Sequence, residues 1–228
     1  MAGAGIVLLA RHASSRLPGK ALAPLGTSPI LEHCLRRLAA AGVGPVILAT
    51  TARPDDDGLA RVATGLGVPV YRGSARDVLR RTLEAADAHG FDVVIRATGD
   101  NPAVDSAAPA RVLAHLMADG ADYACETDLP VGAGVEAMTR TALARCAAAA
   151  STGPDREHVT TLIKRESTRY RAVHAAAPAE LRRPDIRLTV DTSDDLAYVR
   201  RLFAWAGGEQ PTLGRLIQAA DVAAVEVA

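Results

Sequence analysis

Short apolar runs alternate with longer amphipathic stretches through the first half of the chain. The apolar runs predict strands over residues 6–10, 45–50, 69–71, 92–97 and 121–125. Stretches with helical spacing of apolar residues predict helices over residues 30–41, 57–65, 75–89 and 107–118. Val93, Val94 and Ile95 are apolar on both faces, as in a buried parallel strand. The alternation therefore predicts an α/β fold with a mostly parallel central sheet and helices on both faces.

The pattern is less regular after this alternation. Further strands are expected over residues 134–138, 170–174 and 186–189, and helices over 142–150, 156–166 and 193–206. Asp105 or Ser106 is expected to cap the helix at 107–118. Asp155 is expected to cap the helix at 156–166, and Asp191 or Ser193 the helix at 193–206. One domain over residues 1–228 accounts for this organisation, with a less regular portion at about 126–180.

Composition narrows the class of protein. Hydrophobic residues make up 49% of the 228 residues and aromatic residues only 3%, so the core must consist mainly of aliphatic side chains. Lys plus Arg equals Asp plus Glu at 26 each, which argues against a nucleic-acid-binding protein. Cys34, Cys125 and Cys146 have neither metal-site spacing nor a disulfide pattern. With no apolar run long enough to span a bilayer and no signal peptide, no membrane association is expected and a cytoplasmic location is the default expectation.

The first predicted strand runs into a loop that carries three cations, Arg11, Arg16 and Lys20. Such a cluster at one strand end suits a triphosphate and the charge that develops as pyrophosphate leaves. Pro18 and Gly19 favour a tight bend that folds the loop over a ligand. The alternative is an ordinary solvated loop. The glycines required by a Walker-type phosphate loop or a dinucleotide fingerprint are missing.

Two aspartates follow predicted strands. Asp100 comes after Gly99, which permits a close backbone approach, and Asp191 follows the run at 186–189. Carboxylates at strand ends are natural Mg²⁺ ligands beside a phosphate. The alternatives are an Asp-Asn-Pro turn at Asp100 and a helix cap at Asp191.

Two further segments contain polar groups at element boundaries. Arg72 and Ser74 lie in a strand–turn–helix junction, where a helix N-terminus favours an anionic ligand, although a capping role for Ser74 explains the residue equally. His158, beside Glu157, is a candidate base, substrate contact or interface residue, and a structural role is the alternative. His12 receives no role.

The ordered motifs resemble one family. ARHASSRLPGKAL, YRGSARDVLRR, RATGDNPAVD, GADYACETDLPVGAGVEAM, REHVTTLI and RLTVDTSDDLAYVRRLF occur in the order found in CMP-sugar synthetase-type cytidylyltransferases, which include CMP-KDO synthetase and a spore-coat polysaccharide branch. The resemblance covers most of residues 5–203. It implies a Rossmann-like nucleotidyltransferase fold, a homodimer, and transfer of CMP from CTP to an anionic acceptor, with Mg²⁺ as cofactor and the portion at 126–180 on the acceptor and dimer side.

The resemblance also implies roles for particular residues. Lys20, Arg11 and Asp100 are the expected catalytic residues, and Asp100 and Asp191 the expected metal ligands. The expected acceptor-binding residues are Glu136, Glu157 and His158. The expected nucleotide-binding residues are Ala10, Arg11, Ser14, Ser15, Arg16, Lys20, Arg72, Ser74 and Thr98.

The acceptor class stays open among acidic sugars, sugar phosphates and phosphonates. Gly134 stands where the family tends to have an aspartate or threonine, which removes a polar group near the expected acceptor. Three alternatives to a cytidylyltransferase remain at this point: a guanylyltransferase or other nucleotidyltransferase acting on a sugar or cyclitol phosphate, a nucleotide-sugar-dependent glycosyltransferase, and a non-catalytic nucleotide-binding protein.

Overall fold

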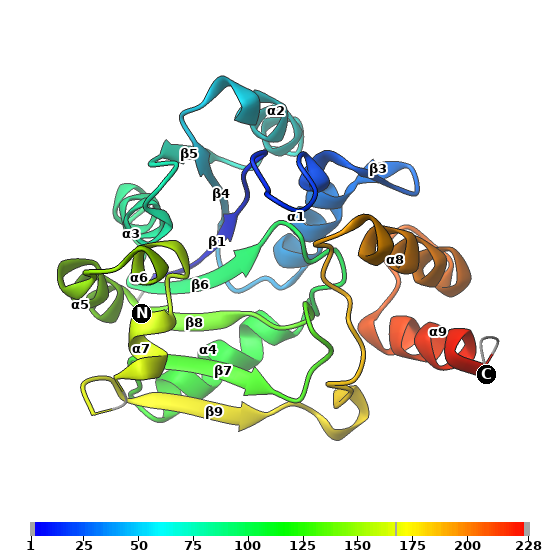
Figure 1. Cartoon of the computed structure of the whole chain (residues 1–228). Coiled ribbons are helices and arrows are strands. Elements are labelled where there is room, and N and C mark those ends of the chain that lie inside the picture. Colours follow the sequence, from blue (N-terminus) through cyan, green and yellow to red (C-terminus); the bar gives the residue numbers. More distant parts are fainter. Residues whose placement is uncertain (1–2, 167, 226–228) are drawn as a thin grey trace.

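A seven-stranded sheet runs through the computed structural model, which describes residues 3–166 and 168–225 (Figure 1). The strand order is β5-β4-β1-β6-β8-β7-β9. The strands are β1 (Ala4–Leu9), β4 (Val46–Thr51), β5 (Val70–Gly73), β6 (Val93–Thr98), β7 (Tyr123–Thr127), β8 (Glu136–Thr139) and β9 (Ala172–Ala176). Strand β8 is antiparallel to β6 and β7, and the remaining neighbours pair in parallel. The mostly parallel sheet predicted from the apolar runs is confirmed.

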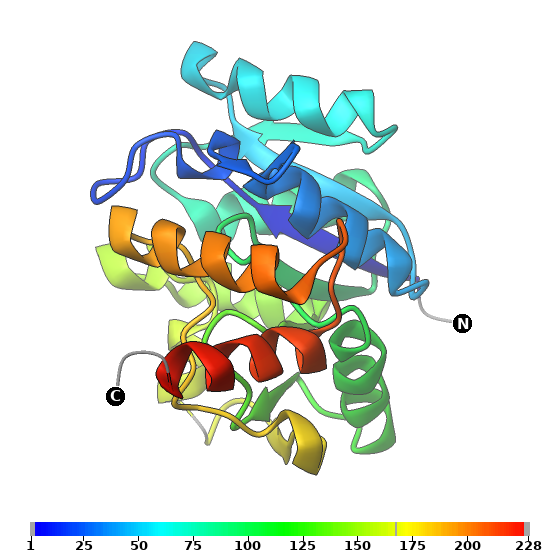
Figure 2. The same ribbon diagram turned by 90° about the vertical axis from the view of Figure 1, so that its right-hand side faces the viewer.

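Helices cover both faces of the sheet because alternate residues of its central strands point into two separate cores. Ile6 and Leu8 of β1 pack in the core on one face, whereas Val7 and Leu9 pack in the core on the other. The first core includes α1 (Ile30–Ala40), α2 (Asp57–Gly65), α4 (Ala108–Ala118), α8 (Ser193–Ala206) and α9 (Leu213–Val225). The second includes α3 (Val78–Ala88), α5 (Arg140–Ala149) and α7 (Thr161–Arg165) (Figures 1 and 2).

Two predictions for the second half of the chain were wrong, and several elements of the chain were not predicted. The helix expected over 156–166 is divided into α6 (Gly153–Glu157) and α7, because the backbone turns at His158 and Val159, the latter with a φ of 36°. The strand expected over 186–189 makes one isolated bridge, between Val131 and Arg187. Helix α9, a two-stranded hairpin of β2 (Pro24–Leu25) and β3 (Ser28–Pro29), and three short 3₁₀ turns were not predicted.

Helix caps also differ from the predictions. Thr192 caps α8 and Thr152 caps α6, each in a reciprocal capping box with an aspartate three residues later, Asp195 and Asp155 respectively. Asp191 therefore does not cap α8 with its carboxylate. Ala107 is the N-cap of α4, although the Asp105 carboxylate accepts a hydrogen bond from its backbone N–H. Among the described residues, no helix is long and apolar enough to cross a membrane.

The segment before α8 is held by backbone hydrogen bonds to two loops. Val131 exchanges bonds with the backbone of residues 186–189, and Val190 N–H donates to the Asp100 carbonyl at 2.9 Å. Gly132 lies at the closest point, with a φ of 95°, and a Cβ there would approach the Thr189 nitrogen to 2.7 Å. A side chain at position 132 would therefore displace the segment that leads to Asp191.

Gly132→Ala is expected to lower the free energy of unfolding by about 1–3 kcal/mol, because alanine meets both an unfavourable φ and a backbone clash. Gly134→Ala is the matched control, since its Cβ would meet only the flexible end of the Leu129 side chain, at 3.3 Å. Chemical denaturation of the two variants checks this. Equal stability of the two variants would contradict the proposed backbone constraint.

Candidate functional site

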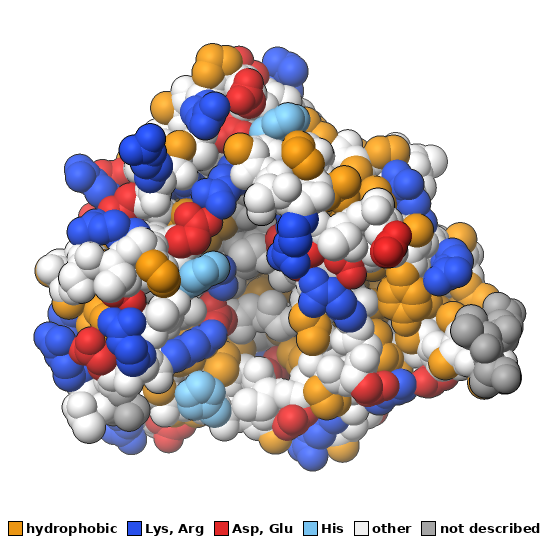
Figure 3. All heavy atoms as spheres, viewed as in Figure 1, with side chains coloured by type: hydrophobic (Ala, Val, Ile, Leu, Met, Phe, Trp, Pro, Cys, Tyr) orange, Lys and Arg blue, Asp and Glu red, His pale blue; other side chains and the backbone are white. Residues whose placement is uncertain are grey.

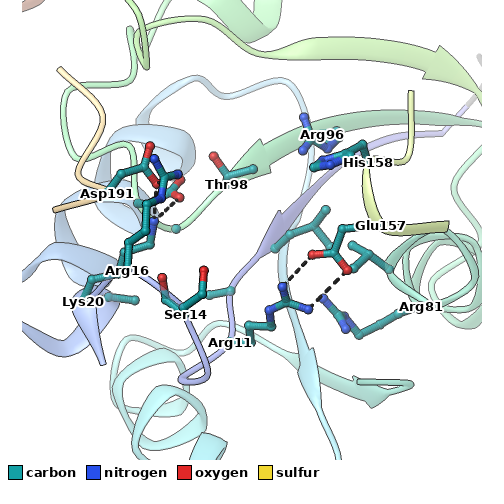
Figure 4. A pocket seen from close by; sticks show the side chains of 17 residues that line it. Arg11, Ser14, Arg16, Lys20, Arg81, Arg96, Thr98, Glu157, His158 and Asp191 are labelled. Carbon is teal, nitrogen blue, oxygen red and sulfur yellow. Dashed lines mark hydrogen bonds and ion pairs between the residues drawn. The ribbon is translucent and has the colours of Figure 1, made fainter. Parts of the chain in front are cut away.

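A cleft of about 350 Å³ opens at the carboxyl ends of β1 and β6 (Figure 4). The loop after β1 forms one wall, the turn after β6 forms the floor, and α3, α6 and the segment before α8 complete the lining. Gly99 makes the floor possible, because a Cβ at this position would approach the Ala10 Cβ to 2.8 Å. The lining residues are Leu9, Ala10, Arg11, Ser14, Ser15, Arg16, Lys20, Ala21, Val78, Arg81, Arg96, Thr98, Gly99, Asp100, Glu157, His158 and Asp191.

One end of the cleft is organised around the Lys20 ammonium group. Its Nζ lies 2.7 Å from Asp100 Oδ2 and 2.8 Å from Asp191 Oδ1. These carboxylates are far apart in sequence, yet they converge on one cation. The structure thus brings together the two aspartates expected to bind a metal and the lysine expected to bind phosphate.

Asp191 has further cationic neighbours. Arg16 Nη2 lies 2.8 Å from its Oδ1, and Arg187 Nη2 lies 2.6 Å from its Oδ2. Burial by itself raises the pKa of Asp191, but the hydrogen bond from Lys20 and the charges of Lys20, Arg16 and Arg187 outweigh it and lower the pKa. Asp191 is therefore an anion at neutral pH, in the protonation state that a metal ligand requires.

The other end of the cleft contains a second ion pair. Arg11 pairs with Glu157, with 2.5 Å between Nη2 and Oε1 and 3.3 Å between Nη1 and Oε2. Arg81 lies beside them, and its guanidinium points toward this pair (Figure 4). Glu157 and His158, which were expected near the acceptor, line the same cleft as the triphosphate loop.

The loop after β1 is held in shape by a buried carboxylate that the sequence did not single out. Asp56, 2% exposed at the start of α2, accepts hydrogen bonds from the His12 N–H at 2.6 Å and the Thr51 N–H at 3.1 Å. Although burial raises the pKa of Asp56, the hydrogen bonds from Thr51 and His12 prevail and lower it. Asp56 thereby fixes the point at which the loop leaves the sheet.

Arg72 and Ser74 lie outside the lining of the cleft. Arg72 donates to the carbonyls of Thr51 and Arg53 and pairs with Asp57. The Ser74 hydroxyl accepts from the backbone of the turn before α3, and its carbonyl accepts from Arg81. Asp77, rather than Ser74, caps α3. In this structure, both Arg72 and Ser74 support the turn, whereas Ser14, Ser15 and Thr98 face the cleft as expected.

A second hollow of about 470 Å³ adjoins the cleft, and Arg96 and Thr98 line both. Glu136 is on its wall and accepts hydrogen bonds from Arg96 Nη1 and the Tyr123 hydroxyl, both at 2.7 Å, and from Lys164. Gly134 lines this hollow too. In the space-filling view, the molecule is hollowed in the middle of the face seen in Figure 1, between basic and acidic side chains (Figure 3).

Arg81 and Arg96 are functional candidates that the sequence reasoning missed. Both belong to motifs quoted above, RGSARDVLRR and RATGDNPAVD. Arg81 occupies a position on α3 that faces the sheet, and Arg96 lies on β6 four residues before Asp100. The signal that could have identified them is a basic residue at an inward-facing position of an otherwise apolar pattern.

A family model described as cytidylyltransferase matches residues 4–221 of the chain. The chain belongs to this family. As a cytidylyltransferase-family member, it is a nucleotidyltransferase, and the Rossmann-like fold expected from the motifs is confirmed.

Relatives and solved structures agree with this membership. The spore coat polysaccharide biosynthesis protein SpsF of Bacillus subtilis is 32% identical over 211 residues, which are 90% of this chain and 88% of that protein. A 3-deoxy-manno-octulosonate cytidylyltransferase of Methylorubrum extorquens is 39% identical over 118 residues, which are 49% of this chain and 45% of that protein. A cytidylyltransferase structure from Leptospira borgpetersenii superposes with a TM-score of 0.92 at 26% identity, over 99% of this chain and 96% of that one.

The Glu136 carboxylate and its partners Arg96, Lys164 and Tyr123 make the stability of the protein depend on pH. Burial raises the pKa of Glu136, but Arg96, Lys164 and the Tyr123 hydroxyl bring it down to about 2, from 4.5 when exposed. A group whose pKa is lowered by folding stabilises the protein above its unfolded pKa and loses that contribution as the pH falls toward the folded value. The affected range is therefore between pH 4.5 and about 2.

Glu136→Gln is expected to lower the stability at pH 7 by on the order of 3 kcal/mol, because the substitution leaves Arg96 and Lys164 without their anion. Below pH 4.5, the stability of the variant should also fall less steeply than that of the wild-type protein. Urea denaturation between pH 7 and pH 3 measures both effects. If the difference between the two proteins stayed constant over this range, the assigned role of the Glu136 charge would be wrong.

Proposed function

We propose that this protein transfers CMP from CTP to an anionic acceptor and releases pyrophosphate. The observation that carries the proposal is the convergence of Lys20 with Asp100 and Asp191 in a cleft also lined by Arg11 and Arg16. In the proposed reaction, an acceptor oxygen forms a bond to the α-phosphorus of CTP while the bond from that phosphorus to the bridging oxygen breaks. Pyrophosphate leaves with the electron pair of that bond.

The cations have a defined task in this reaction. Arg11, Arg16 and Lys20 bind the triphosphate and stabilise the negative charge that grows on the leaving pyrophosphate. Lys20 is 11% exposed and Arg11 is 36% exposed, so the two occupy positions of different depth in the cleft. Ser14, Ser15 and Thr98 add hydroxyl groups to the lining, to which Ala10 also belongs. An anionic acceptor needs little help from a general base.

Mg²⁺ is the proposed cofactor, held by Asp100 and Asp191. The donor set suits it, since two carboxylates that already share a cation leave the remaining positions to phosphate oxygens and water. When bound, Mg²⁺ neutralises phosphate charge and acts as a Lewis acid. Lys20 must then exchange its contacts with the carboxylates for contacts with the phosphates.

The second hollow is the proposed acceptor site. It adjoins the cleft at Arg96 and Thr98, so an acceptor bound there has access to the α-phosphate. Glu136 positions Arg96 to receive an anionic group. His158 lines the adjoining cleft. The names of SpsF and the 3-deoxy-manno-octulosonate enzyme favour an acidic sugar destined for a polysaccharide, with sugar phosphates and phosphonates as the other classes. A cytoplasmic homodimer is the form in which we propose the enzyme works.

Thermal unfolding in the presence of CTP, GTP, UTP, ATP or dTTP, each with and without Mg²⁺, tests the nucleotide assignment. A ligand at about 100 times its Kd adds roughly 2.7 kcal/mol of stability, so CTP with Mg²⁺ should raise the Tm more than the other nucleotides do. Pyrophosphate release with 3-deoxy-manno-octulosonate, sugar phosphates and phosphonates then identifies the acceptor class. A selective shift with GTP would instead favour a guanylyltransferase, and no shift with any triphosphate would refute the proposal.

Asp100→Asn should lower kcat by on the order of a hundredfold or more, and Lys20→Met should lower kcat/KM for CTP to a similar extent. Both variants should keep the fold, because the residues are partly exposed in the cleft. Asp119→Asn, just after α4, is the matched control and should behave like the wild-type protein. Wild-type turnover in Asp100→Asn or Lys20→Met would contradict the assigned roles.

A further inference from the structure

Arg187 is connected to the cleft through Asp191 and does not line it. Its side chain is 44% exposed and lies outside the set of lining residues. The guanidinium group donates from Nη2 to Asp191 Oδ2 at 2.6 Å and from Nε to Asp195 Oδ1 at 3.0 Å. One exposed ion pair adds little to stability, but a planar guanidinium that bridges two carboxylates fixes how they lie relative to each other.

Asp195 closes a ring of hydrogen bonds around Asp191. Its Oδ2 accepts from the backbone N–H groups of Asp191 and Thr192, both at 2.9 Å, while its Oδ1 accepts from Arg187. The backbone of residue 191 and its carboxylate are therefore held by the same pair of side chains. Asp195 lies in the first turn of α8, so the ring joins the Asp191 carboxylate to a helix that packs in the core.

The two oxygens of the Asp191 carboxylate have different partners. Lys20 and Arg16 contact Oδ1 from the cleft, whereas Arg187 contacts Oδ2 (Figure 4). In the proposed reaction, Lys20 and Arg16 turn to the triphosphate, and Arg187 keeps its contact because it is outside the lining. Oδ1 is then left for another cation, next to Asp100 Oδ2, with which it shares Lys20.

We propose that Arg187 is a positioning residue that, together with Asp195, orients Asp191 Oδ1 toward the divalent cation. This inference rests on the proposed metal site and adds the residues that hold one of its ligands in place. Loss of a group that orients a metal-binding side chain typically costs ten- to hundredfold in metal affinity.

A simpler role for Arg187 is to balance the charge of Asp191. Lysine would fill that role equally well, because it carries the same charge. It would not replace the bridge, since an ammonium group on a flexible stem lacks the planar fork that meets two carboxylates at once. The two roles therefore predict different behaviour for Arg187→Lys.

Thermal unfolding at a fixed, saturating concentration of CTP and increasing Mg²⁺ tests the proposal. The Mg²⁺ concentration that gives half of the full rise in Tm should increase about tenfold or more in Arg187→Met, because the Asp191 carboxylate is no longer held toward the metal ion. Arg187→Lys should show most of the same increase. Binding of Mn²⁺ with CTP, measured by electron paramagnetic resonance, should weaken in parallel.

Arg183→Met is the matched control. It removes an arginine of the same segment that pairs with Asp185 and Asp221 and has no contact with Asp191. This variant should keep the wild-type dependence on Mg²⁺ even if its Tm without ligands is lower.

Asp195→Asn tests the ring from its other side. The amide oxygen can still accept from the backbone N–H groups, but the charge that holds Arg187 is lost. Its loss of metal affinity should add to that of Arg187→Met less than fully in the double variant, because both changes act through one contact. If Asp195→Asn fails to fold, as judged by circular dichroism, the exposed Arg187 still provides the test.

Each outcome is decisive. A wild-type Mg²⁺ dependence in Arg187→Met would overturn this inference and leave the proposed function standing, provided that Mg²⁺ promotes CTP binding by the wild-type protein. A wild-type Mg²⁺ dependence in Arg187→Lys beside a loss in Arg187→Met would make charge balance the role and also overturn it. No effect of Mg²⁺ on CTP binding by the wild-type protein would overturn the proposed metal site and this inference together.

Discussion

The contact between the Lys20 ammonium group and the carboxylates of Asp100 and Asp191 determines how the rest of the cleft is built. It joins the loop after β1, the turn after β6 and the segment before α8, which come from three distant parts of the chain. Arg16 and Arg187 add to the same cluster through Asp191. At the opposite end of the cleft, Arg11 is likewise neutralised by a carboxylate of the chain, that of Glu157. Cations that the sequence suggested for phosphate are thus balanced by acids of the chain itself.

This balance has a consequence for ligand binding. A triphosphate that took Lys20 and Arg16 would leave Asp100 without its cation and Asp191 with Arg187 alone. Two carboxylates in a partly buried cleft would then repel one another. The divalent cation proposed above would restore the balance, so the binding of a triphosphate and of a metal ion would favour each other. In this arrangement, the affinity for either ligand alone is limited by the charges that the other would neutralise.

The sequence predicted the sheet and the convergence of Lys20, Asp100 and Asp191 well, because both depend on local signals. Apolar runs locate the strands, and polar residues after β1 and β6 meet at one sheet edge by geometry alone. The end of α6 is different. The chain around its break at His158 and Val159 contacts distant segments, since Arg156 pairs with Asp77 before α3 and the Thr160 hydroxyl donates to Glu136 of β8. The pairing of Glu157 with Arg11 joins residues 146 positions apart. Likewise, the segment before α8 looked like a strand because its apolar residues are buried, but it is paired by a single bridge.

The second hollow shows why charge alone does not identify the acceptor. Its two cations, Arg96 and Lys164, are both bound to Glu136, whose carboxylate also accepts from Tyr123 and Thr160. An acceptor with a carboxylate can share Arg96 with Glu136, because a guanidinium has five donors. A group with two negative charges, such as a phosphate, would face the Glu136 charge at close range and would need compensation from the cations of the cleft. As the proposed acceptor site, the hollow therefore favours an acceptor with a single negative charge, placed where Arg96 lines both the cleft and the hollow, and with otherwise neutral groups.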